Sequence, residues 1–182
     1  MNPRSFSDEG IVLTRRNYSE ADRILSVYSK NHGRITLLAK GVRKPASRKR
    51  GHIEVFSRIR FQAVYGKGFD LITEAEIIDN FPLIRKNLRR VALSYYFMEV
   101  IGRMTHEGET NNELYLDILN TLESLKKEKK LKSLRKDFIV NILTRLGFWP
   151  RGRALPDPDT KLEEVIERDI SAVRVGKRLL EV

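Results

Sequence analysis

Residues 1–80 are dominated by short stretches in which apolar and polar positions alternate. Five such stretches can be delimited: 9–15, 23–29, 34–40, 53–65 and 69–78. Alternation with a period of two is typical of β-strands with one buried face. Tight turns are predicted at Asn31-His32-Gly33 and Gly66-Lys67-Gly68, because Asn and Gly adopt positive φ angles at little cost. Short strands joined by such turns and one long connector predict a small barrel, and the five-stranded OB-fold is the expected architecture.

Beyond Phe81-Pro82 the spacing of apolar residues changes to the period of a helix. Three helices are expected: 83–104, a second that follows Asn111-Asn112 and ends in the basic run Lys126–Lys132, and about 134–146. Cations at a helix C-terminus meet the negative end of the helix dipole, and Gly147 is a typical stop signal after the third helix.

Residues 151–160 are rich in Pro and Asp and are expected to form a loop, and 161–182 are expected to form one or two short helices. The predicted fold class is α+β. An OB-fold barrel is expected over residues 1–80, and an all-α helical domain over residues 81–182.

Positive charge is concentrated in the first sixty residues. The formal net charge of the chain is +11, and residues 1–60 contain 14 Lys and Arg against 5 Asp and Glu, whereas residues 61–182 contain 21 against 19. The segment Lys40–Arg60 alone carries eight cations and one acid, Glu54. Charge of this density on a folded domain favours binding to phosphates, because release of counterions supplies affinity that does not depend on sequence. The alternative is a solvated loop that only keeps the protein soluble.

Several functional classes are disfavoured by what the sequence lacks. It contains no cysteine, which excludes disulfides, thiolate zinc sites and a cysteine nucleophile. It contains no phosphate-binding loop with a Walker lysine and no paired metal-binding histidines. No apolar run approaches the roughly 20 residues of a membrane span, and the N-terminus lacks a signal-peptide core. We therefore expect a cytoplasmic protein that is not an enzyme and uses no cofactor or metal.

The residues expected to bind nucleic acid are cations on the connector, on strand faces that alternate with the core, or in turns. The first group is Arg34, Lys40, Arg43, Lys44, Arg48, Lys49, Arg50, Arg58 and Arg60, and the second is Arg15, Arg16 and Lys67. Tyr18 and Phe56 are candidates for stacking on bases. Tyr28, Phe61 and Tyr65 are expected to fill the barrel instead.

The chain resembles RecO, the bacterial recombination-mediator family of DNA repair. The matching pieces in the barrel region are Gly10–Leu13, Arg16–Leu25, Gly33-Arg34, Ala39–Lys44, Ser47, and Leu71 with Thr73–Glu76. In the helical region they are Tyr95-Tyr96 with Glu99, and Leu146–Phe148 with Pro150. The order and spacing of these pieces together carry the resemblance, since no single piece is diagnostic.

The resemblance implies an N-terminal OB-fold and a helical domain, binding to single- and double-stranded DNA, and annealing of complementary strands. It also implies partnership with RecR and with single-stranded DNA-binding protein, so that RecA is loaded on coated strands. Many family members hold zinc with four cysteines after the Gly-aromatic-x-Pro segment. Residues 151–159 contain none, so no structural zinc is expected. The chain after residue 150 is also short for the family, which weakens the implied contact with the single-strand binder.

Two other functions remain open from the residues alone. One is a non-catalytic adaptor whose basic face docks an acidic protein. The other is an OB protein that prefers RNA to DNA. The same cations would serve all three functions.

Overall fold

The computed structural model describes residues 5–47 and 51–166, which form two compact units. The barrel unit contains the chain up to Asn80 together with Thr105–Asn112. The helical unit contains Phe81–Met104 and the chain from Glu113 onwards. The polypeptide therefore leaves the barrel unit, returns to it for one short segment, and leaves it again.

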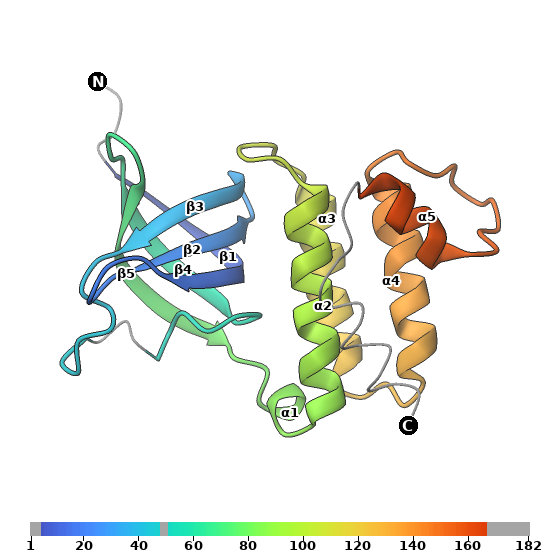
Figure 1. The fold of residues 1–182 in the computed structure, drawn as a ribbon, viewed down its shortest axis with the longest axis horizontal. Coiled ribbons are helices and arrows are strands. Elements are labelled where there is room, and N and C mark those ends of the chain that lie inside the picture. The colour runs from blue at the N-terminus through green and yellow to red at the C-terminus, as the bar shows by residue number, and fades with distance from the viewer. Residues whose placement is uncertain (1–4, 48–50, 167–182) are drawn as a thin grey trace. The chain divides into compact units, whose positions relative to one another are not determined.

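The barrel unit is built from five strands, shown from blue to green in Figure 1. They are β1 Ser5–Asn17, β2 Arg23–Ser29, β3 Gly33–Ala39, β4 Arg58–Val64 and β5 Asp70–Asp79. The strands close into a barrel in the order β1-β2-β3-β5-β4, with β3 and β5 parallel and the other pairs antiparallel. This confirms the expected five-stranded OB architecture followed by helices. The interior is apolar and is packed around residues such as Val27, Leu37 and Phe61.

One expected strand is shorter than its sequence pattern indicates. The stretch 53–65 was expected to be continuous, but β4 begins only at Arg58. Phe56 has a φ of 55°, which breaks the alternation of an extended strand. Its side chain is fully buried, so its expected position on the exposed side of the strand, available for stacking, is wrong.

The three aromatic residues expected inside the barrel lie in different places. Phe61 lies inside the barrel as expected. Tyr28 is buried but lies on the outer side of the barrel wall, because its neighbour Val27 takes the interior position. Tyr65 was expected inside and is 53% exposed, with its ring 5.1 Å from that of Phe6. It is the residue after β4, where alternation no longer determines the side that faces inward.

A buried carboxylate fixes the β2–β3 turn against β1. Asp8 is almost fully buried and accepts hydrogen bonds from the backbone and side-chain amides of Asn31, at 3.1 and 2.8 Å. His32 Nδ1 lies 2.7 Å from Asp8 Oδ2, the oxygen that also accepts the Asn31 backbone N–H. Asp8 Oδ1 also accepts the backbone N–H of Glu9 at 2.8 Å. The buried carboxylate thus has hydrogen-bond partners for both of its oxygens.

Replacing Asp8 with Ala is expected to destabilise the barrel by about 2–3 kcal/mol, because the donors of Asn31 and His32 lose a charged acceptor at a buried site. Urea unfolding followed by circular dichroism measures the change. Glu74→Ala, which removes an exposed carboxylate from β5, is the matched control and is expected to change the free energy of unfolding by less than about 0.5 kcal/mol. Equal effects of the two substitutions would contradict a structural role for Asp8.

Between residues 81 and 166 the structure describes five helices. They are α1 Pro82–Arg85, α2 Leu88–Met104, α3 Asn112–Leu125, α4 Leu131–Arg145 and α5 Pro158–Val165. Three of them match the expected positions, and Gly147 has the positive φ of a stop signal. The helix expected over 83–104 is interrupted before Leu88, where the Asn87 side chain accepts the Arg90 backbone N–H and caps α2.

Two segments of the helical unit differ from expectation. α3 ends at Leu125, so most of the basic run from Lys126 lies in the connection to α4 rather than in a helix. α5 begins within the segment that was expected to be a loop, because Asp157 caps it and Pro158 occupies its first turn. Arg135 of α4 forms an ion pair with Asp159 of α5, at 2.8 Å between Nη2 and Oδ2, and thereby fixes α5 on α4.

Candidate nucleic-acid interface

The outer face of β2 and β3, where OB barrels usually bind oligonucleotides, is apolar and buried here. Ile24 and Leu38 are paired across the two strands on this face, and Tyr28 is paired with Arg34. Ile24, Tyr28 and Leu38 are each less than 9% exposed. A strand with both faces buried is expected to read as a nearly continuous apolar run, which fits the sequence of β2. This face therefore offers little surface to a nucleic-acid strand.

Part of the cover is the segment Thr105–Asn112, which we call the clasp. The Gly108 backbone N–H donates to the Arg34 carbonyl at 2.9 Å, and the Tyr28 hydroxyl lies 3.5 Å from the Asn111 carbonyl. Burial, with a smaller contribution from the negative charge of Glu109, raises the pKa of Tyr28 to about 12. The clasp is part of the barrel unit although it lies between two helices in the sequence.

Arg34 lies beside the clasp and is half-buried. Its backbone forms an isolated parallel β-bridge with that of Glu107. Its side-chain Nε has no hydrogen-bond partner among residues 5–47 and 51–166. It was expected on an open basic face together with Lys40. The structure separates the two, because Arg34 is at the clasp end of β3 and Lys40 follows the opposite end.

The outer face of β4 is not the basic side that the sequence of this strand predicts. Arg58 forms an ion pair with Glu9 at 3.0 Å, and Arg60 lies 3.6 Å from Glu76. Both carboxylates come from the strands on either side of β4. Arg15 is similarly paired with Glu54 at 2.7 Å. The sequence pattern of β4 alone could not reveal this balance of charge, because the balance depends on the register between neighbouring strands.

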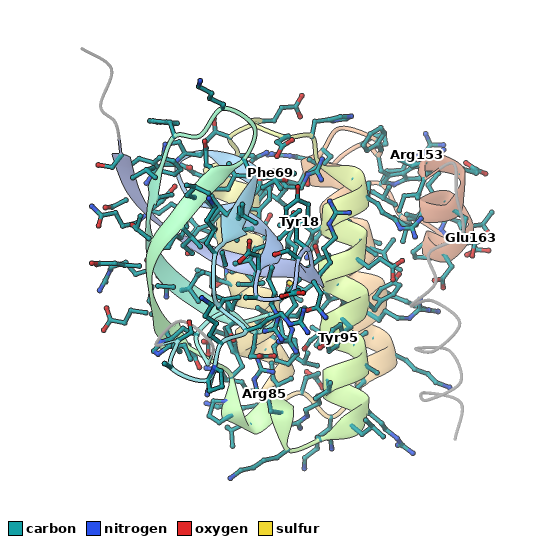
Figure 2. All side chains as sticks on the ribbon, turned by 60° about the vertical axis from the view of Figure 1, so that its left-hand side comes forward. Tyr18, Phe69, Arg85, Tyr95, Arg153 and Glu163 are labelled. Atoms are coloured by element: carbon teal, nitrogen blue, oxygen red, sulfur yellow. The ribbon has the colours of Figure 1, made fainter. Side chains whose placement is uncertain are left out.

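Cations that have no carboxylate partner among the described residues gather instead where three loops of the barrel meet. The Arg43 guanidinium donates to the Ser19 carbonyl at 3.0 Å and its backbone N–H to the Ala21 carbonyl at 2.9 Å, which joins the β1–β2 loop to the start of the β3–β4 connector. The rings of Tyr18 and Phe69 meet edge to face at 5.9 Å, which joins the β1–β2 and β4–β5 loops (Figure 2). We call this surface the loop rim. Its members are Arg16, Tyr18, Lys40, Arg43, Lys44, Lys67 and Phe69.

The loop rim combines exposed cations with an exposed aromatic ring. Tyr18 is 57% exposed. Within the described part of the chain no carboxylate forms an ion pair with any of the rim cations, Arg16, Lys40, Arg43, Lys44 and Lys67. Asp22, in the β1–β2 loop, accepts the Gly41 backbone N–H at 2.8 Å. This hydrogen bond, helped by the charges of Lys40 and Lys44, lowers the pKa of Asp22.

Three expected site residues are not described by the structure, and one residue of the loop rim was not expected. Arg48, Lys49 and Arg50 lie outside the described residues, on the connector that begins at the rim. Phe69 was not among the expected site residues, because it was placed at the start of a strand. Its position directly after the Gly66–Gly68 turn, in the loop that joins the last two strands of an OB barrel, is the signal that could have identified it.

The helical unit has a hollow of about 380 Å³ that is lined by Asp117, Asn141, Arg145 and Arg151, among others. Arg145 Nε donates to Asp117 Oδ2 at 2.7 Å, and its Nη1 contacts Glu113. These carboxylates raise the pKa of Arg145 and neutralise its charge. The hollow is therefore a poor site for a phosphate.

The segment where a zinc module would be expected does not fit a metal. It contains no cysteine, its Asp157 is the cap of α5, and its Asp159 is paired with Arg135. Asp157 accepts hydrogen bonds from Thr160, which lower its pKa. In the described ranges no group of three potential ligands of the His, Cys, Asp and Glu types comes together.

The fold and the loop rim define a class of protein, namely an OB-barrel protein with a helical second unit and a basic loop surface. Comparison with known proteins gives the family. Residues 1–81 match the model of the N-terminal part of recombination protein O, and residues 85–154 match the model of its C-terminal part. The chain belongs to the RecO family.

Curated relatives that the chain resembles are named DNA repair protein RecO. The protein from Pelotomaculum thermopropionicum is 36% identical over 145 residues, which cover 80% of this chain and 56% of the relative. The proteins from Moorella thermoacetica and Dehalococcoides mccartyi are 34% and 32% identical, over 82% and 90% of this chain. The aligned regions cover 55% and 65% of those two relatives, so the chain spans little more than half the length of several relatives. Among the described residues, no helix is both long and apolar enough to cross a membrane.

Proposed function

We propose that this chain is a non-catalytic DNA repair and recombination mediator that binds single- and double-stranded DNA and anneals complementary strands. The observation that carries the proposal is the loop rim, which combines an exposed tyrosine with cations that have no carboxylate partner among the described residues. Such a surface suits a single strand, because cations neutralise phosphates while bases stack on aromatic rings. Membership of the RecO family, whose curated relatives are named DNA repair proteins, supports DNA as the ligand.

The proposed mechanism of annealing needs no fuel and no reacting group. Two complementary strands repel each other through their phosphates, and a cationic surface that neutralises them lowers this repulsion. The base pairs that form then supply the free energy. The rim cations Lys40, Arg43, Lys44 and Lys67, together with Arg16, are the proposed phosphate ligands, and the connector residues Arg48–Arg50 extend them. Arg15, Arg34, Arg58 and Arg60 are lower-ranked candidates, because each is ion-paired or lies beside the clasp.

The proposed partners are RecR and single-stranded DNA-binding protein. In this proposal RecR joins the DNA-bound protein and helps to load RecA on strands that are coated by the single-strand binder. The support for these partners is the family resemblance, since the described residues contain no feature specific to either protein.

The experiment is an annealing assay with two complementary DNA oligonucleotides that carry a fluorescent donor and acceptor. The purified chain is expected to accelerate annealing of bare strands at low salt and to lose this effect as salt rises. The same assay with strands coated by single-stranded DNA-binding protein tests the partner. Acceleration on bare strands alone would support the proposed DNA function and contradict the proposed contact with single-stranded DNA-binding protein. Absence of both binding and annealing would contradict the proposal and favour a protein adaptor.

A further inference from the structure

The helical unit carries a second cluster of positive charge that its nearly neutral composition hides. Residues 81–90 contain four cations and no acid, and residues 123–132 contain five cations and two acids. The two segments lie at one end of the unit, the lower end in Figure 1, where α1, the start of α2 and the α3–α4 connection are drawn. We call this surface the helical basic end. Its cations are Arg85, Lys86, Arg89, Arg90, Lys126, Lys127, Lys129, Lys130 and Lys132.

Contacts within the unit hold the two segments together. The Arg90 guanidinium donates to the backbone carbonyls of Lys126 and Glu128, at the point where α3 ends. The ammonium group of Lys126 lies 4.8 Å from the centre of the Phe81 ring. The cations of the two segments therefore form one surface rather than two separate clusters.

Three exposed lysines of the helical basic end carry charge that no carboxylate of the described residues neutralises. Lys126 is paired with Glu123 at 2.8 Å, and the carboxylate of Glu128 accepts the backbone N–H of Lys130. No carboxylate in the described part of the chain forms an ion pair with Lys127, Lys129 or Lys132, and all three are exposed. A cluster of like charges costs free energy through self-repulsion and attracts a polyanion.

Cations rather than acids occupy the first turns of α2 and α4. The first turns of α2 and α4 contain no acid, and Arg89 and Lys132 lie at these positive helix ends, where the dipole disfavours cations. Lys130 occupies the cap position of α4 without a side-chain capping hydrogen bond. Local rules that are broken without a visible structural gain are a mark of functional surfaces.

We infer that the helical basic end is a second DNA-binding surface that holds the backbone of the second strand during annealing. The inference rests on the proposed function, and it assigns the first strand to the loop rim. The two surfaces differ in chemistry, because the rim has Tyr18 and Phe69 for stacking, whereas the cations of the helical end supply only phosphate contacts. A strand held by its phosphates alone keeps its bases free to pair. This surface is therefore expected to bind more weakly and to be more sensitive to salt than the rim.

The test is co-capture of two strands that cannot pair. A biotinylated oligonucleotide on beads is saturated with the full chain, and a labelled non-complementary oligonucleotide is added at low salt. The wild-type protein is expected to retain the second strand. Lys129→Glu/Lys132→Glu is expected to reduce this retention at least tenfold and to reduce affinity for the first strand less than threefold. Arg151→Glu/Arg153→Glu, with the same charge change beyond the other end of α4, is the control and is expected to retain both strands.

Folding does not confound this test. Lys132→Glu supplies the acid that the first turn of α4 lacks, so the thermal midpoint of the variant is expected to be equal to or higher than that of the wild type. Retention of the second strand by Lys129→Glu/Lys132→Glu would overturn the inference. A loss of first-strand affinity of more than tenfold would overturn it too, because the two surfaces would then form one track for one strand.

The remaining outcomes separate this inference from the proposed function. Binding of the first strand by the wild-type protein without capture of a second would overturn the second surface and leave the proposed function intact. Binding of polyglutamate to the helical end without a second DNA strand would also overturn it, in favour of an acidic protein partner. Absence of any DNA binding would overturn the proposed function itself.

Discussion

The variant Lys40→Gln/Lys44→Gln/Lys67→Gln is expected to bind single-stranded DNA about 10- to 100-fold more weakly than the wild type at 0.1 M salt. Each of the three ammonium groups is exposed at the loop rim and has no carboxylate partner within the described residues. Each lost phosphate contact is expected to reduce the slope of log K against log salt by about 0.7 on single strands. The slope should therefore fall by about 2 for the triple variant. Fluorescence anisotropy with a labelled oligonucleotide over a range of salt concentrations measures both quantities.

The matched control is Lys30→Gln/Arg58→Gln/Arg60→Gln on the same unit. These three cations are already paired, Lys30 and Arg58 with Glu9 and Arg60 with Glu76. The control is expected to change affinity less than about threefold, because the carboxylates of Glu9 and Glu76 balance most of the charge of these three cations. A larger effect of the control than of the rim variant would move the DNA interface to the outer face of β4. Random oligonucleotides of equal length should give the same result for both variants, since the contacts are to phosphates.

Gly33→Ala is expected to destabilise the barrel unit by about 3–4 kcal/mol and to release the clasp. Gly33 has a φ of 65°, which costs an alanine about 1–2 kcal/mol. An added Cβ would also lie 2.0 Å from the Glu109 carbonyl oxygen, so the clasp must shift. The hydrogen bond from Gly108 to Arg34 would then be lost, with a further cost of about 1 kcal/mol. Urea unfolding measures the free energy.

Gly41→Ala is a close control for this substitution. Gly41 has a φ of 64°, and its added Cβ would contact only the Lys44 side chain at 3.8 Å. It should therefore show the cost of the backbone conformation alone, about 1–2 kcal/mol. Release of the clasp is followed by limited digestion with a glutamate-specific protease, because Glu107 and Glu109 lie within the clasp. Faster cleavage at these residues in Gly33→Ala than in Gly41→Ala is expected, and equal cleavage would show that the clasp does not depend on the space at Gly33.

The strands show how much of the fold a local sequence pattern can predict. Residues 23–29 were expected to form a strand from alternation alone, and β2 has these bounds. The same rule misplaced Phe56 and Tyr65, because it assumes an extended chain throughout. A single positive φ at Phe56 and the end of β4 before Tyr65 remove that assumption. Similarly, Asp157-Pro158 encodes the cap and first turn of α5, whereas the Pro- and Asp-rich composition of the whole segment 151–160 favours a loop.

The composition of the chain predicts its class of ligand, and the tertiary structure decides where the proposed site lies. Eight cations between Lys40 and Arg60 predict a polyanion from charge alone, and the order of short motifs indicates the RecO family. Whether Arg58 and Arg60 are available to bind phosphates depends on the strands that lie beside β4. The register of these strands brings a carboxylate next to each arginine. Side-chain charge is a property of each residue, so the sequence states it, whereas neutralisation of that charge depends on neighbours brought from elsewhere in the chain.

The same distinction applies to the surfaces that remain. Alternation predicted β2 as a strand with one buried face, and only the structure shows that the clasp, about 80 residues further along the chain, lies against its outer face. The loop rim and the helical basic end likewise join segments that are distant in sequence, through the contacts of Arg43 with Ser19 and of Arg90 with Lys126. Local interactions select strands, turns and helices, because they act between near neighbours. The assembly of a binding surface depends on contacts between segments that are far apart in the sequence, and a local pattern contains no information on these contacts.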